Sequence, residues 1–243
     1  MDYTQYLMLP QLLTLQQIQS KPEHPDELLF IIVHQASELW FKVLLHEMEQ
    51  MAEAMEANDA PRAVSSITRI NVLMNIVSQQ LAALDTLPPQ RFAQFRGYLG
   101  TSSGSQSDQF RAIEARSGLR DEHFLQVIRE HGQPPALVQK ALDAPLMQDQ
   151  FLALVERAGL TLEQVYTEHE HSALAQLAEG LLAYEQQFAQ WRFLHVQLVE
   201  RIIGPQTGGT GGTLGAKYLN RTLQNRCFPA LWAVRAKFYG AAR

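Results

Sequence analysis

The sequence predicts an all-α fold on three observations. Apolar residues recur three and four positions apart along most of the 243-residue chain, which is the spacing of amphipathic helices. No stretch alternates apolar and polar residues for long enough to predict a half-buried strand. Hydrophobic residues make up 46% of the chain, enough for a large core, and no low-complexity linker or fixed-period repeat divides it. We therefore expect a single helical-bundle domain over residues 1–243.

Proline, glycine and capping residues set the limits of the predicted helices. Pro25-Asp26-Glu27 is a favourable helix start, and Pro88-Pro89 opens a short helical segment. The glycine-rich run 208–213 ends a long helix. In chain order, the predicted helices cover Glu27 to Asn58, Arg62 to Leu84, residues 90–99, Gln106 to Ser117, Glu122 to Glu130, Ala136 to Ala158, a long helix from Leu162 or Ser172 to Ile203, and a C-terminal helix that includes residues 219–225.

Charge and composition argue against several classes of function. The chain has 20 basic and 25 acidic residues, a formal charge of −5 and no long run of one sign, so we expect no nucleic-acid binding. The N-terminus lacks the basic and apolar regions of an export signal, and no stretch of about 18 apolar residues predicts a membrane span. The single cysteine, Cys227, excludes an intrachain disulfide and a cysteine-rich metal site. We expect a cytoplasmic protein whose metal, if any, is held by histidine, carboxylate or a cofactor.

Two histidines lie on apolar helix faces. His195 is in the middle of an apolar stripe within WRFLHVQLVERIIG, and His34 follows Phe30 by four residues on a second stripe. Imidazole is a common axial ligand of haem iron, and an apolar helix face suits a flat hydrophobic macrocycle. The commoner alternative is a neutral core histidine that hydrogen-bonds a carbonyl group. The two residues are therefore either satisfied core histidines or an opposed pair, one ligating iron and one facing a bound ligand.

A third helix face and two loops are candidates for substrate binding. Phe92 and Arg96, four residues apart, could pack a ring on an aromatic amino acid and fork a guanidinium onto its carboxylate. The alternative is a core phenylalanine beside a surface arginine. The glycines around Thr210 favour a loop that closes over a substrate, or else a surface linker. The loop 101–107 either brings hydroxyl groups to a ligand or only caps the next helix.

Four sequence blocks together resemble the tryptophan 2,3-dioxygenases, a family of haem enzymes. The blocks are FIIVHQASELWFK, FRGYLGTSSGSQSDQFRAIE, WRFLHVQLVERIIG followed by GTGG, and FPALWAVR. They occur in the family's order, and the resemblance extends from near residue 3 to near residue 235. It implies a homotetramer that binds haem b between its long helices. It also implies that the protein adds both atoms of O₂ across the indole C2–C3 bond of L-tryptophan, giving N-formylkynurenine in the kynurenine pathway of tryptophan catabolism.

The same resemblance implies roles for individual residues. The family's axial iron ligand falls on His195. Its distal histidine falls on His34, which would act in catalysis by hydrogen-bonding the indole N–H or the oxygenated intermediate. The other implied positions are Phe30 and Phe92 around the indole, Arg96 on the carboxylate, Thr210 over the amino-acid end, Leu99, Ser103 and Gly104 beside the haem, and Tyr3, which would reach a neighbouring subunit's pocket.

The sequence departs from the family's pattern in two loops. Ser105 replaces a residue that is usually aromatic, and Thr213-Leu214 replaces a pair of serines. These changes affect the pocket wall and leave the iron ligand and the carboxylate clamp in place. One alternative is therefore a related haem monooxygenase that converts tryptophan or a substituted tryptophan to a 2-oxindole. Another is a non-catalytic haem-binding sensor, which the presence of Arg96 argues against because a gas sensor needs no amino-acid clamp.

Overall fold

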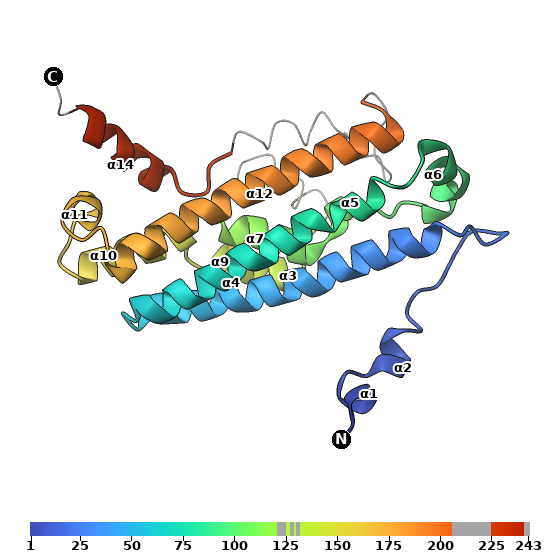
Figure 1. Ribbon diagram of the computed structural model, residues 1–243, viewed down its shortest axis with the longest axis horizontal. Coiled ribbons are helices and arrows are strands. Elements are labelled where there is room, and N and C mark those ends of the chain that lie inside the picture. Colours follow the sequence, from blue (N-terminus) through green and yellow to red (C-terminus); the bar gives the residue numbers. More distant parts are fainter. Residues whose placement is uncertain (121–124, 127–128, 130–131, 206–224, 241–243) are drawn as a thin grey trace.

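The computed structural model is an elongated bundle of helices (Figure 1). It describes residues 1–120, 125–126, 129, 132–205 and 225–240. Within these ranges every regular element is helical, which confirms the all-α prediction. The long axis is formed by α3 (Glu27–Glu56), α4 (Ala60–Gln79) and α12 (Ala173–Ile203), and α4 packs against both of the others. The remaining helices are α1 (Tyr3–Tyr6), α2 (Leu9–Leu12), α5 (Leu81–Leu84), α6 (Pro89–Arg96), α7 (Asp108–Arg116), α9 (Ala136–Asp143), α10 (Met147–Arg157), α11 (Leu162–Thr167) and α14 (Pro229–Gly240), with 3-10 turns η1 (Gly97–Leu99) and η2 (Gly104–Gln106).

Two of the predicted helices are interrupted. The prediction of one helix over residues 136–158 is wrong, because Pro145 has no N–H to donate and forces the preceding residue out of the helical region. Ala144 is accordingly extended, with ψ of 148°, and the chain forms α9 and α10 instead. The helix predicted over residues 62–84 breaks at Gln80, where ψ of −21° is typical of a 3-10 turn. Most of the helices predicted over 122–130 and 219–225 lie outside the described residues.

The long helix α12 starts at the second of its two predicted positions. The hydroxyl group of Ser172 accepts a hydrogen bond from the backbone N–H of Ala175 at 3.2 Å, which satisfies a donor that the helix itself leaves unpaired. The earlier candidate start, Leu162, begins the separate helix α11. At the other end, Gly204 has φ of 85°, a left-handed conformation that glycine adopts without strain. The predicted end at Ile203 is therefore confirmed.

The helix α12 packs closely against α4 at Gly180. A Cβ atom added to Gly180 would lie 2.7 Å from Cγ2 of Ile67, which is 1% exposed. The absence of that atom lets the two helices approach each other, and the side chain of Asn71 donates to the Gly180 carbonyl at 3.0 Å. Around this contact, Leu44 and Met48 of α3 are also completely or almost completely buried. The three long helices thus share one core.

A buried carboxylate on α12 holds the C-terminal helix. Glu185 is 2% exposed and accepts hydrogen bonds from the backbone N–H groups of Cys227 at 2.9 Å and Phe228 at 2.8 Å. It also accepts from the Trp232 indole at 2.7 Å and from the Arg226 guanidinium at 3.1 Å. A carboxylate with this many donors is well compensated for its burial. The chain that follows residues 206–224 is therefore fastened to the middle of α12.

By length and hydropathy alone, α3 could cross a membrane. Its packing is that of a core helix along one face, where Phe41, Leu44 and Met48 are at most 5% exposed. The opposite face carries partly exposed apolar residues, among them Ile32 and Leu39. A single helix of this kind also occurs in the cores of soluble proteins, so it does not establish a membrane span.

Candidate functional site

His34 of α3 and His195 of α12 lie close enough to each other to interact electrostatically. Burial lowers the pKa of His195, and the nearby His34 contributes by disfavouring a second positive charge, so that together they bring this pKa to about 4. His195 is therefore neutral at physiological pH. Its ring has no hydrogen-bond partner among the residues that the structure describes, so a nitrogen lone pair is available to bind a metal ion or haem iron. The structure thus brings together the two histidines that the sequence singled out.

The neutral form of His34 has a defined tautomer. Its Nδ1 atom lies 2.7 Å from the carbonyl oxygen of Phe30, which can only accept, so Nδ1 carries the proton and Nε2 is left as an acceptor. Burial among neighbouring atoms lowers the pKa of His34, although the Phe30 carbonyl and Glu38 act in the opposite direction. The ring is nevertheless accessible to solvent. This combination is expected for a side chain in the wall of an open cavity.

Phe30 and Phe92 belong to one aromatic cluster, formed where α3 meets α6. Their ring centroids are 5.5 Å apart, and Phe95 packs against both, at 5.8 Å from Phe30 and 5.2 Å from Phe92. Phe30 also lies against His34, with ring centroids 4.2 Å apart. Leu99, predicted to lie beside a cofactor, packs on the same cluster. The structure therefore places the two phenylalanines of the predicted indole pocket together, with Phe30 next to His34.

Arg96 is the last residue of α6, one helical turn after Phe92, and is partly buried. The chain beyond it is open, because a Cβ atom added to Gly97, Gly100 or Gly104 would meet nothing within 4 Å. Ser103 is partly buried, and its backbone N–H donates to the side chain of Gln106 at 3.1 Å. The chain that follows Arg96 thus consists largely of small residues with open space around its glycines.

The capping role considered for the loop 101–107 is confirmed at Ser107, whose hydroxyl group accepts from the Phe110 N–H at 3.1 Å at the start of α7. Thr210 and Thr213-Leu214 lie outside the described residues, as does the side chain of Ser105.

Tyr3 is not brought to the histidine pair of its own chain. It belongs to α1, and Figure 1 shows that α1 and α2 extend away from the bundle. The side chain of Tyr3 is 74% exposed, and apolar side chains along the whole segment are exposed as well. These are Met1, Tyr3, Tyr6, Leu7, Met8, Leu12, Leu13 and Leu15. We call residues 1–15 the N-terminal arm.

A buried ion network beside His195 was not predicted. Glu114 of α7 accepts from the guanidinium groups of Arg192 and Arg111, each at 2.6 Å, and all three side chains are at most 13% exposed. Arg192 lies three residues before His195, so the network fixes how α12 is rotated relative to α7. Helical spacing could not have revealed it, because a charged residue next to an apolar stripe is normally expected in solvent.

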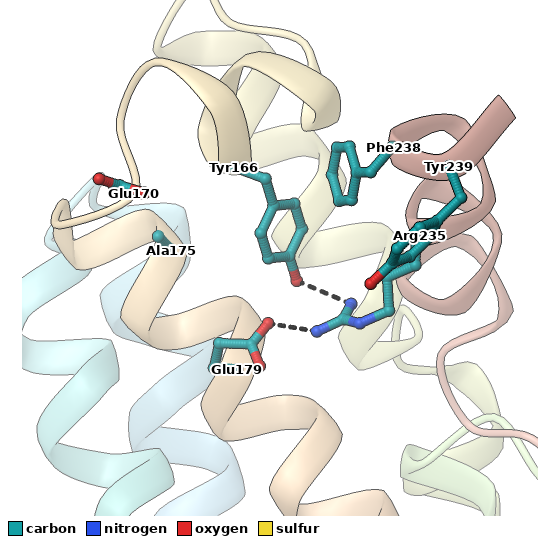
Figure 2. Close-up of a pocket in the computed structure, with 7 residues that line it drawn as sticks. All are labelled: Tyr166, Glu170, Ala175, Glu179, Arg235, Phe238 and Tyr239. Atoms are coloured by element: carbon teal, nitrogen blue, oxygen red, sulfur yellow. Dashed lines mark hydrogen bonds and ion pairs between the residues drawn. The ribbon is translucent and has the colours of Figure 1, made fainter. Parts of the chain in front are cut away.

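A hollow of about 330 Å³ lies between α11, α12 and α14 and is separate from this site (Figure 2). The guanidinium group of Arg235 enters it, donates to the Tyr166 hydroxyl at 3.2 Å and forms an ion pair with Glu179. Glu179 precedes His195 by about 24 Å along α12, at a rise of about 1.5 Å per residue. Arg235 of α14 therefore already pairs with the polar groups of this hollow, Tyr166 and Glu179. These contacts attach α14 to α11 and α12.

Comparisons with known proteins agree with this arrangement. A family model described as tryptophan 2,3-dioxygenase matches residues 1–133 and 138–238. The tryptophan 2,3-dioxygenase of Kineococcus radiotolerans is 38% identical over 98% of this chain and 91% of its own length. Those of an Arthrobacter species and Caulobacter vibrioides are each 36% identical over 98% of this chain, covering 92% and 98% of their own lengths. The chain belongs to the tryptophan 2,3-dioxygenase family.

Proposed function

We propose that the protein is a haem-dependent tryptophan 2,3-dioxygenase of the kynurenine pathway of tryptophan catabolism. It adds both atoms of O₂ across the indole C2–C3 bond of L-tryptophan and yields N-formylkynurenine. Membership of the family makes it an oxidoreductase of the dioxygenase class. The observation that carries the proposal is the pairing of two neutral histidines next to an aromatic cluster that ends in Arg96.

His195 holds haem b as the axial ligand of its iron. A neutral imidazole without a hydrogen-bond partner in the described part of the chain and an open stretch at Gly100 and Gly104 both fit such a group. Leu99 offers an apolar contact to the macrocycle, and Ser103 a polar one. When bound, ferrous haem supplies the activation of O₂, and the protein supplies the ligand, the substrate position and the pocket.

L-Tryptophan, or a substituted tryptophan, binds with its indole against Phe30 and Phe92. The guanidinium group of Arg96 donates two parallel hydrogen bonds to the substrate carboxylate, a bidentate geometry that arginine favours. The Nε2 atom of His34 accepts the hydrogen bond of the indole N–H, because the Phe30 carbonyl already holds the proton on Nδ1. His34 acts as the catalytic residue by orienting this N–H. Thr210 closes over the amino-acid end of the substrate.

The chain forms one domain over residues 1–243 and assembles as a homotetramer in the cytoplasm. The exposed apolar side chains of the N-terminal arm support assembly, because a contiguous apolar surface of this kind is typical of a protein contact. Tyr3 on that arm then reaches a neighbouring subunit's pocket. The protein binds neither nucleic acid nor membrane, in keeping with a formal charge of −5 and the core packing of α3.

A monooxygenase that forms a 2-oxindole is the second candidate, favoured by Ser105 and Leu214, where the sequence departs from the family's pattern. A non-catalytic haem sensor is disfavoured because the Phe30 and Phe92 cluster leads directly to Arg96. A sensor of a diatomic gas has no use for a carboxylate clamp.

Replacement of the axial ligand tests haem binding. We expect His195→Ala to lose haem, because the iron is left without a protein ligand, as measured by the haem-to-protein ratio and the Soret band after reconstitution. His171→Ala is the control, since the His171 side chain is 94% exposed. A His195→Ala protein with a normal Soret band and full activity would refute the assignment.

Removal of the guanidinium group tests substrate binding. Arg96→Ala should keep its haem but bind L-tryptophan roughly 30- to 160-fold more weakly, or about 2–3 kcal/mol, because charge-assisted bonds to a carboxylate are lost. Affinity is measured from the change in the haem spectrum on titration with tryptophan. The control is Arg62→Ala. Arg62 lies in the first turn of α4, where it contacts Glu53 at 3.4 Å. An unchanged affinity removes Arg96 from the site.

The contribution of the N-terminal arm can be measured in mixed tetramers. Light scattering should give a mass near four times the 27.5 kDa of one chain. We expect Tyr3→Ala to lower kcat/KM more than Tyr6→Ala, which removes a 73% exposed ring from the same arm and so measures the effect on assembly alone. Tetramers reassembled from Tyr3→Ala and Arg96→Ala chains should regain activity, because some pockets then combine an intact Arg96 with a partner's intact Tyr3. A monomeric mass, or no recovery, contradicts the proposal.

The reaction itself is distinguished by isotope labelling. The haem-loaded, reduced protein is mixed with L-tryptophan and ¹⁸O₂, and the product is analysed by mass spectrometry. We expect both labelled atoms in the product. A single labelled atom establishes the oxindole-forming alternative, and the absence of any product from a haem-loaded protein contradicts turnover of L-tryptophan.

A further inference from the structure

The indole ring of Trp191 lies parallel to the imidazole ring of His195. The two residues are one turn apart on α12, their ring centroids are 5.2 Å apart and their planes differ by 9°. Rotation of a histidine ring about its Cβ–Cγ bond is normally only loosely restricted. A flat partner on one side removes much of that freedom, because the imidazole cannot turn without losing the stack. In the sequence, Trp191 is distinguished only as one residue of the apolar stripe that contains His195.

Trp191 is itself held by aromatic rings from three helices. Phe110 of α7 lies 4.8 Å away, Phe41 of α3 meets the indole edge-on at 6.4 Å, and Phe188 of α12 is stacked at 6.5 Å. The indole also contacts both the main core and the smaller cluster near the site. It is therefore a fixed surface, and the imidazole adopts the orientation that this surface allows.

The indole N–H of Trp191 does not explain why a tryptophan is present. Its Nε1 atom is buried and has no acceptor among the described residues. Trp232, by contrast, donates to Glu185 at 2.7 Å. An unpaired buried donor is unfavourable, and a phenylalanine would fill apolar space without it. What the tryptophan adds at this position is the larger flat face that covers the imidazole.

We propose that Trp191 is a positioning residue for His195. Its indole fixes the plane of the imidazole, so that the nitrogen lone pair has the same direction before and after iron binds. This inference rests on the proposed function, in which His195 is the axial ligand. Partners that orient a metal-binding histidine normally do so by hydrogen bonds, whereas the partner here is an aromatic stack.

Three variants test the role in the haem-loaded protein. Trp191→Leu removes the flat face, Trp191→Phe keeps a smaller one, and Trp40→Leu is the control at another half-buried tryptophan that packs on the main core. The readouts are the Fe–His stretching band in the resonance Raman spectrum of the ferrous protein and the rate of haem loss to apomyoglobin.

We expect Trp191→Leu to shift or broaden the Fe–His band and to speed haem loss on the order of 10- to 100-fold, the usual effect of removing a ligand's orienting partner. Trp191→Phe should give a smaller change in the same direction, and Trp40→Leu should match the wild type even where its melting temperature falls. If Trp191→Leu behaves like Trp40→Leu in both readouts, the residue is only part of the core and the proposal fails.

A measurement without haem separates this proposal from the axial assignment. The ring current of the indole should move the His195 C–H proton resonances upfield, and Trp191→Leu but not Trp40→Leu should remove that shift. Absence of the shift in the wild-type protein shows that the rings are not stacked and overturns the proposal. The upfield shift and the Fe–His band report on different assignments. If the wild-type protein shows the shift but its ferrous haem shows no Fe–His band, the rings are stacked but His195 is not the axial ligand. The positioning role is then overturned together with the axial role.

Discussion

The close approach of α4 and α12 at Gly180 is the constraint on which the position of the site depends. The helix α12 has 31 residues and is about 46 Å long. A small rotation of α12 about its axis, or a small shift along it, would therefore displace every side chain on the helix, including His195. Ile67 occupies the space that a side chain at position 180 would fill. Further along the same helix, Glu185 receives four hydrogen-bond donors and Arg192 joins the buried ion network. These contacts fix α12 at successive positions between Gly180 and His195.

The charges near His34 and His195 are arranged so that both imidazoles stay neutral. Glu114 is buried with the guanidinium groups of Arg192 and Arg111, so the cost of removing these charges from water is offset by their pairing. His195 has no such compensation among the described residues, and the Phe30 carbonyl and Glu38 offset the burial of His34 only in part, so the pKa of each histidine is lowered. Two neutral imidazoles and an aromatic cluster suit a flat apolar group and an indole. Arg96, at the end of that cluster, supplies the positive charge that a carboxylate requires.

The predicted site is assembled from parts of the chain that differ in how firmly they are held. His34, Phe92 and His195 come from helices that contribute to the core, and the rings of Phe30 and Trp191 lie directly against the two histidines. The segment from Gly97 to Ser107 is built largely of small residues and two short 3-10 turns. The helices α1 and α2 of the N-terminal arm extend away from the bundle (Figure 1). Such a division suits a site whose iron ligand is fixed by the scaffold and whose outer wall is completed by loops and by a second chain.

Local sequence determined the helical class, the end of α12 at Ile203 and the faces that carry His34, Phe92 and His195, because periodicity and helix-ending residues act on their neighbours in the chain. It also contained the break at Pro145, which outweighs the apolar period of the residues around it. Tertiary structure decided that His34 and His195 lie close enough to interact electrostatically. It also decided that Arg192 is buried in an ion pair with Glu114 and that the indole of Trp191 lies against His195. These contacts join residues on different helices or depend on what surrounds one helix. Their formation is governed by packing in three dimensions, about which the period of a single helix carries no information.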